Sequence, residues 1–166
     1  MFAAAGSWEV TPRVRVAGQL ERWGWHDAFS SLPITLTNGT NAVINSLVGS
    51  PTIEEIVPLA WKNQLVRRVG TEYTWSRSVV LRGGYAYSPS PVPTDTLTPM
   101  TAAIVEHTFG AGLGLIHGKT AIDVGFQWSP TTERRVQETA LQGSEYDGTS
   151  VAVGAQGLVV SVRRRF

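Results

Sequence analysis

Residues 121–128 read Ala-Ile-Asp-Val-Gly-Phe-Gln-Trp, and from Ile122 to Trp128 every second side chain is apolar. Because successive side chains of a β-strand point to opposite faces of a sheet, this stretch separates its apolar residues from Asp123 and Gln127. Residues 105–115 repeat the alternation just upstream. The short link at 116–119 therefore predicts an antiparallel hairpin of two half-buried strands.

The same period of two recurs along the rest of the chain. The segment at 64–75 has one exception, since Arg67 falls on its otherwise apolar face. The last segment is apolar on both faces until its basic end, which leaves its register open. Together with the first hairpin these segments predict about seven strands and no helix. The additional segments are 2–9, 13–21, 64–75, 79–87 and 151–166.

The connections between these segments alternate in length. Short turns are expected at 10–12, 76–77 and 117–119, whereas the intervening connections are long and rich in Pro, Ser and Thr. Short turns at one end and long loops at the other are typical of outer-membrane barrels, whose short turns face the periplasm. We therefore predict an all-β fold, an antiparallel transmembrane β-barrel wall with meander topology over residues 1–166. The long connections are 26–58, 88–103 and 129–149.

The composition agrees with a membrane location. Only 16% of the 166 residues are charged, against about a quarter in soluble domains. No run approaches the roughly 18 apolar residues that a spanning helix needs, but a closed barrel crosses a bilayer with every backbone group paired. Residues 1–6 lack the basic start and apolar core of a signal peptide, which an outer-membrane protein needs in order to cross the inner membrane. If the chain is exported, we therefore expect it to be a fragment of a longer gene product.

Nothing in the sequence indicates an enzyme, a cofactor or a metal centre. Gly118-Lys119-Thr120 matches the end of a phosphate-binding loop, but the first glycine of that motif would fall at Leu113. The three histidines lack metal-ligand spacing, cysteine is absent, and no serine triad is indicated. A net charge of +1 gives no reason to expect nucleic acid as a partner, and Arg163–Arg165 alone are a weak signal.

The candidate functional groups are the charged residues on the polar faces of the predicted strands. Two interpretations remain open for them. An arginine inside the barrel could hold a fatty-acid carboxylate by charge-assisted hydrogen bonds. The favoured alternative is a mutual ion-pair network, because pairing is the common state of buried charges. The candidate lumen-facing residues are Arg68, Glu72, Arg82, Glu106 and Asp123.

Glycines share the polar face with these charges. A glycine inside a strand weakens a sheet and marks either a bend or the close approach of another group. For a barrel, that group would be a plug or a ligand in the lumen. The glycines concerned are Gly110, Gly112, Gly114 and Gly125.

Three runs of residues carry a resemblance to a known family. The second of them is the most specific, and the third is a terminal strand that closes on Phe166, as is common in outer-membrane barrels. The first run is Trp61-Lys62-Asn63-Gln64 with Val66, Arg68, Gly70, Glu72 and Tyr73. The second is Leu81-Arg82-Gly83-Gly84-Tyr85, Ser90-Pro91-Val92-Pro93, Thr96-Leu97, Pro99 and Ile104-Val105-Glu106-His107.

In order and spacing these runs resemble the C-terminal half of the FadL/TodX family of outer-membrane transporters. The resemblance implies passive uptake of long-chain fatty acids or other hydrophobic compounds across the outer membrane of a Gram-negative bacterium. It also implies an N-terminal hatch and further strands that this segment lacks. The implied partners are the hydrophobic cargo, membrane lipid and lipopolysaccharide, and the barrel-assembly machinery through Phe166.

Two other classes compete with this interpretation. One is a soluble β-barrel or sandwich that acts as a binding module. The other is a structural or general-diffusion outer-membrane barrel. The aromatic residues separate a membrane barrel from a soluble sandwich. They fall near the ends of the predicted strands, as membrane-interface belts do, whereas a sandwich would bury them. The residues concerned are Tyr73, Trp75, Tyr85, Tyr87, Phe126 and Trp128.

Overall fold

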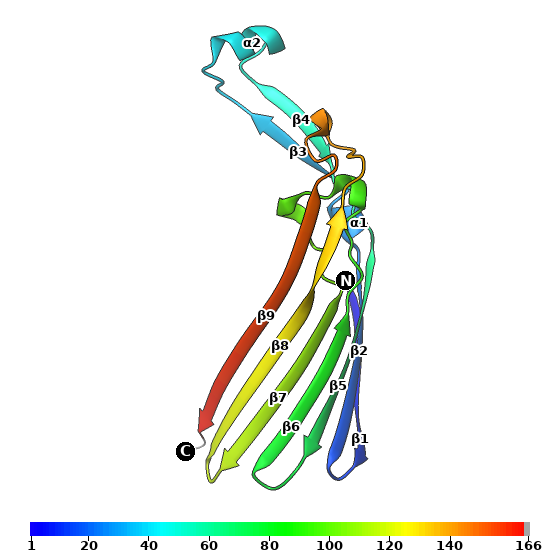
Figure 1. The fold of residues 1–166 in the computed structure, drawn as a ribbon, viewed down its shortest axis with the longest axis vertical. Helices are drawn as coiled ribbons and strands as arrows, with labels where there is room; N and C mark the ends of the chain where they lie inside the picture. The colour runs from blue at the N-terminus through cyan, green and yellow to red at the C-terminus, as the bar shows by residue number, and fades with distance from the viewer. Residues whose placement is uncertain (165–166) are drawn as a thin grey trace.

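The computed structural model describes residues 1–164, and its main element is one antiparallel sheet of seven strands. Each strand pairs with the next strand of the sheet along the chain, so the predicted meander is confirmed (Figure 1). The edges are the first and last strands. The seven strands are β1 (Phe2–Thr11), β2 (Val14–Trp23), β5 (Gln64–Thr74), β6 (Val79–Tyr87), β7 (His107–His117), β8 (Thr120–Arg135) and β9 (Ser150–Arg164).

The short turns gather at one end of the tilted strands and the long connections at the other, as Figure 1 shows. His117 and Thr120 are paired across the β7–β8 turn, in which Gly118 adopts a positive φ of 56°. At the turn between β1 and β2, the Thr11 hydroxyl accepts hydrogen bonds from the backbone N–H groups of Arg13 and Val14. The predicted division into a short-turn end and a long-loop end is therefore confirmed.

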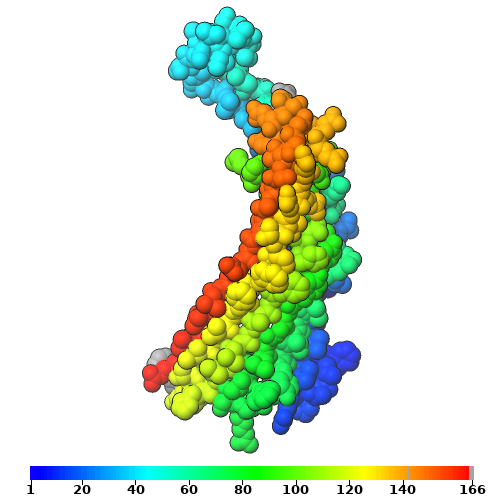
Figure 2. Space-filling view, in the orientation of Figure 1, coloured from blue at the N-terminus to red at the C-terminus, as the bar shows by residue number. Residues whose placement is uncertain are grey.

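The prediction of no helix is wrong for the first long connection. Residues 31–58, here called the arm, form a separate two-stranded sheet that carries a helix at its tip and stands clear of the main sheet (Figures 1 and 2). The Asn41 side chain caps that helix by accepting hydrogen bonds from two backbone N–H groups, and Gly49 ends it with φ 75°. The arm consists of β3 (Ser31–Leu36), α2 (Ala42–Val48) and β4 (Ile53–Pro58), and the short helix α1 (Trp25–Ala28) precedes it.

The predicted loop at 129–149 is also too long, because β8 continues to Arg135. The register between β8 and β9 shifts between Ser129 and Thr132, where one extra residue is inserted on β8. Such a bulge reverses the side-chain alternation, and this hides the end of the strand from a search for period two. Gly154 on β9 makes room for the bulge, since a Cβ there would lie 2.6 Å from the Thr131 hydroxyl oxygen.

A small hydrophobic core joins the long connections to one another. It contains Val92, Leu97 and Ile104 from the β6–β7 connection, Val136 from the β8–β9 connection, and Val151 from the start of β9. The long connections and this core together form a cap over the long-loop end of the sheet. The Thr96 hydroxyl donates a 2.8 Å hydrogen bond to the carbonyl of Leu59, which ties the base of the arm to this cap. The cap also holds the short 3-10 helices η1 (Thr94–Thr96), η2 (Pro99–Thr101) and η3 (Gln142–Ser144).

Over residues 1–164, no helix is long and apolar enough to cross a membrane.

Candidate functional site

The two faces of the sheet differ in chemistry. Residues that pair across antiparallel strands share a face, so the register assigns each side chain to one side. Asp123 pairs with Gly114, whereas Phe126 pairs with Ala111, and the two side chains point to opposite faces as predicted. The apolar face, here called the outer face, is solvent-accessible, with Phe126 46% exposed. It carries Val79, Leu81, Tyr85, Phe109, Leu113, Leu115, Ile122, Val124 and Phe126.

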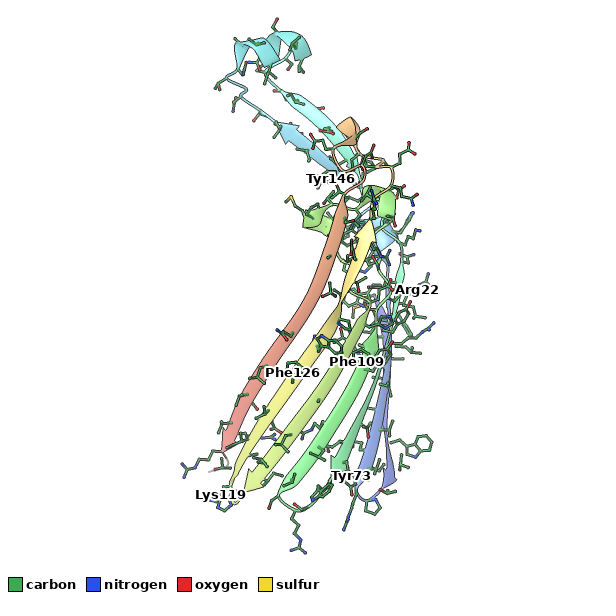
Figure 3. All side chains as sticks on the ribbon, viewed as in Figure 1. Arg22, Tyr73, Phe109, Lys119, Phe126 and Tyr146 are labelled. Atoms are coloured by element: carbon green, nitrogen blue, oxygen red, sulfur yellow. The ribbon has the colours of Figure 1, made fainter. Side chains whose placement is uncertain are left out.

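Aromatic side chains lie at two heights on the outer face. Tyr73 and Trp75 meet edge to face near the short turns, with ring centroids 6.1 Å apart. In Figure 3 Tyr73 lies near the short-turn end, whereas Phe109 and Phe126 lie higher on the sheet. Aromatic rings prefer the membrane–water interface, so two such bands mark the two edges of a bilayer. The upper band contains Tyr85, Tyr87, His107, Phe109 and Trp128.

The opposite face, here called the inner face, borders an open hollow of about 820 Å³. Small residues are frequent in its lining, and valines such as Val66, Val105 and Val159 add apolar side chains. Charges enter it from two of the predicted residues, Arg68 and Arg82. Such a concave strip with few polar groups is suited to a weakly polar ligand. The small residues of the lining include Gly84, Ala86, Gly110, Gly112, Gly125 and Gly157.

Three of the five predicted residues form one ion-pair cluster across the sheet. The Arg82 Nε donates to Glu72 Oε2 at 2.7 Å, and its Nη1 donates to Asp123 Oδ1 at 2.7 Å. The three residues come from β6, β5 and β8, so Arg82 must reach across β7 to meet Asp123. The arrangement is a mutual ion-pair network, the alternative that the sequence favours over an arginine free to hold a ligand.

Glycines on β7 make this reach possible. A Cβ on Gly114 would lie 2.9 Å from Asp123 Oδ1 and 3.0 Å from Arg82 Nη1, and one on Gly112 would lie 3.4 Å from the Arg82 Cβ. The group that approaches these two glycines closely is therefore the Arg82 side chain. No such group approaches Gly125, where a Cβ would meet nothing within 4 Å.

Arg68 pairs with a carboxylate that the candidate set did not contain. Its Nη1 lies 2.6 Å from Glu21 Oε1, and the Glu21 carboxylate also accepts hydrogen bonds from Gln19 and Trp23. Glu21 is 8% exposed, although its side chain is charged. Alternation with Val14, Val16 and Leu20 puts Glu21 on the polar face of residues 13–21. Its partner became visible only from the register, which sets Gln19 opposite Arg68.

Glu106 lies away from the cluster, at the long-loop end. Its carboxylate accepts a 2.7 Å hydrogen bond from Arg134 and a 3.0 Å bond from the backbone N–H of Ser90. These contacts tie the β6–β7 connection to the upper end of β8. The alternation gave no sign of Arg134, because this residue lies in the loop predicted at 129–149. In residues 1–164, no group of three His, Cys, Asp or Glu side chains could hold a metal ion.

The sheet defines a class of protein. It is one antiparallel meander with an apolar, aromatic-banded outer face and an ion-paired, glycine-rich inner face. The outer-face side chains, such as Leu81, Phe126 and Trp128, are exposed, whereas a sandwich would bury them. This is the wall of a transmembrane β-barrel.

The chain belongs to the family of outer membrane protein transport proteins (OMPP1/FadL/TodX), whose family model matches residues 1–166. Members of this family are outer-membrane proteins of Gram-negative bacteria, so the predicted location is confirmed. The resemblance inferred from the three sequence runs is confirmed as well.

Individual relatives agree with the family assignment. The chain is 24% identical over 155 residues to alkane uptake protein A of Marinobacter nauticus, covering 86% of this chain and 30% of that protein. The toluene transporter TbuX of Ralstonia pickettii has a similar structure, with a TM-score of 0.62, 12% identity, and coverage of 98% of this chain and 32% of the other. The toluene transporter TodX of Pseudomonas putida is also similar in structure, with a TM-score of 0.57 and 18% identity. The match covers 94% of this chain and 31% of TodX. The chain thus spans about a third of the length of these relatives.

Proposed function

We propose that this chain forms part of the wall of a channel through which hydrophobic compounds cross the outer membrane by passive diffusion, with no catalytic step. The observation that carries this proposal is the inner hollow, whose lining combines glycine, alanine and valine with arginines that are already paired. Such a surface offers a hydrophobic molecule a path without strong binding groups. The relatives named for alkane and toluene transport support the same cargo class.

The ion pairs bear on which hydrophobic compounds are carried. The two carboxylates beside Arg82 give the cluster a net charge of −1, from one positive and two negative groups. A fatty-acid carboxylate that approached this guanidinium would be repelled by the two carboxylates already beside it. We therefore propose uncharged hydrocarbons as the preferred cargo, ahead of long-chain fatty acids, with all five candidate residues serving the wall and its lining.

We also propose that residues 1–166 supply the C-terminal portion of a larger barrel. Strands β1 and β9 both run from the long-loop end toward the short turns, and they lie at opposite edges of the sheet. Pairing them with each other would give a parallel contact, so an antiparallel barrel needs an odd number of additional strands. Coverage of 30% of alkane uptake protein A and 32% of TbuX supports this proposal.

The remaining proposed partners are molecules outside the barrel: membrane lipids and the machinery that assembles barrels. We propose lipid and lipopolysaccharide as the molecules against the outer face, since its apolar residues are exposed over the whole height of the sheet. The barrel-assembly machinery is proposed to recognise the terminal Phe166, which lies outside the described residues.

Uptake measurements test the proposed function. The polypeptide that carries this chain is expressed in a Gram-negative host that lacks its own channel for hydrophobic compounds, and uptake of radiolabelled hexadecane is followed. We expect faster uptake than in the empty host and no change in the permeation of small sugars into reconstituted liposomes. Rapid swelling of those liposomes in sugar solutions would instead indicate a general-diffusion barrel, and unchanged hexadecane uptake would refute the proposal.

A further inference from the structure

The outer face carries few charges. Glu133 and Arg135 point outward at the upper end of β8, above the bulge, and below the bulge the outward-facing charges share one sign. Between the short turns and the upper aromatic band, the outward-facing strand residues include no Asp and no Glu within residues 1–164. The charged ones are three arginines: Arg164 near the short turns, and Arg22 and Arg67 toward the long-loop end. Arg67 is the residue that broke the apolar pattern in the sequence.

Arg22 and Arg67 are close neighbours on this face. The register pairs Arg67 with Leu20 on one side and Tyr87 on the other, and it pairs Arg22 with Leu65. The two arginines are therefore diagonal across β2 and β5, at a separation of about 7–8 Å that long side chains can bridge. Figure 3 shows Arg22 near the upper end of the sheet.

Neither arginine has a counter-charge in the part of the chain that the structure describes. Both side chains are exposed, and neither forms a hydrogen bond or an ion pair there. Arg68, the next residue after Arg67, points to the inner face and is paired with Glu21 at 2.6 Å. The inner arginine is thus neutralised by the protein, whereas its outer neighbours are left with their charge toward the membrane.

The depth of Arg22 and Arg67 in the membrane determines which negatively charged group can bind them. A lipid-facing arginine is most costly at mid-bilayer and nearly free of cost at the interface. Arg67 pairs with Tyr87, a member of the upper aromatic band, so both arginines lie at headgroup level. In barrels of this type the long loops lie on the extracellular side of the outer membrane. The headgroups at that level of an outer membrane are those of lipopolysaccharide, whose lipid A part carries phosphates.

We propose that Arg22 and Arg67 form a binding site for a lipid A phosphate on the outer face of the wall. A guanidinium offers two parallel donors that match phosphate oxygens, and two guanidinium groups at this spacing can hold one phosphate between them. Leu20 and Val69, each 51% exposed, lie beside and below the arginines, where the acyl chains of the same lipid would pack. The site is independent of the cargo that the channel carries.

A lipid titration tests the site. The polypeptide that carries this chain is purified from outer membranes in detergent and titrated with bisphosphorylated lipid A, with lipid A stripped of its phosphates, and with inorganic phosphate alone. We expect tight binding of the bisphosphorylated lipid, weak binding of the stripped lipid, and no displacement by inorganic phosphate. Equal binding of the two lipids would overturn the proposal, and full displacement by inorganic phosphate would show a general anion site instead.

Variants locate the binding residues. The double substitution Arg22→Gln with Arg67→Gln should weaken binding of bisphosphorylated lipid A at least about tenfold, which corresponds to about 1.4 kcal/mol. Arg77→Gln, in a short turn at the other end of the sheet, removes the same kind of charge and should leave binding unchanged. If the double variant fails to fold, Arg22→Lys with Arg67→Lys keeps both charges but loses the paired donors, and it should still bind less tightly. Binding equal to that of the native protein in a folded variant of either kind contradicts the assignment.

Discussion

Substitutions at Glu72 and Asp123 test whether these carboxylates prevent Arg82 from binding a fatty-acid carboxylate. Glu72→Gln with Asp123→Asn keeps the shape of both side chains but changes the charge of the cluster from −1 to +1. The freed guanidinium could then bind a carboxylate, and a hydrogen bond to a charged group contributes about 1.5–3 kcal/mol. Since the Arg82 side chain is 42% exposed, water screens the interaction and the lower value applies. That gain corresponds to about a tenfold increase in carboxylate affinity.

The assay compares two molecules of equal chain length. Uptake of radiolabelled palmitate and hexadecane is measured in a host that lacks its own channel for hydrophobic compounds. We expect the native protein to favour hexadecane, and the double variant to take up palmitate about tenfold better at low concentration with hexadecane uptake unchanged. A control pair, Glu54→Gln with Glu55→Gln, removes two neighbouring carboxylates from β4 of the arm and should alter neither rate.

Three results would refute this reasoning. Unchanged palmitate uptake in a correctly folded double variant would place Arg82 away from the path of the cargo. Equal palmitate uptake by the control pair would trace the effect to overall charge. Palmitate uptake by the native protein that already exceeds hexadecane uptake would show that paired arginines do not exclude carboxylates.

The other predictions concern the wall itself. Gly114→Ala should destabilise the sheet by about 1 kcal/mol more than Gly125→Ala in urea unfolding, because a Cβ at Gly114 would lie 2.9 Å from Asp123 Oδ1 and one at Gly125 meets nothing within 4 Å; equal costs would contradict the packing. Replacing the arm, residues 31–58, by a two-glycine link should leave the circular dichroism of the main sheet intact, since Ser31 and Pro58 pair at its base; loss of that signal would show that the arm supports the sheet. The isolated 166-residue chain should show no saturable hydrocarbon uptake in liposomes and should associate through β1 and β9, since an open edge recruits other chains; uptake by a monomer would show that it closes a barrel of its own.

The sequence determined the two-faced sheet. Lipid outside and water inside require opposite side chains on alternate positions, so the pattern at 121–128 assigned Phe126 and Asp123 to opposite faces without any knowledge of the fold. The alternation of short and long connections then set the direction of each strand. This local rule failed at 129–135, where a bulge reverses the alternation, and in the arm, where capping by Asn41 and Gly49 builds a helix with no period-two signal.

The partners of the charged residues were decided only by the tertiary structure. Arg82 was identified as a lumen-facing residue, but its contacts with Glu72 and Asp123 depend on the register of three strands and on the glycines of β7 between two of them. Glu21 and Arg68, likewise, are far apart in the chain and meet because β2 pairs with β5 across the arm. The same register brings Arg22 beside Arg67 on the outer face. Register is a property of paired strands, and no single strand encodes which residue of its neighbour will lie opposite.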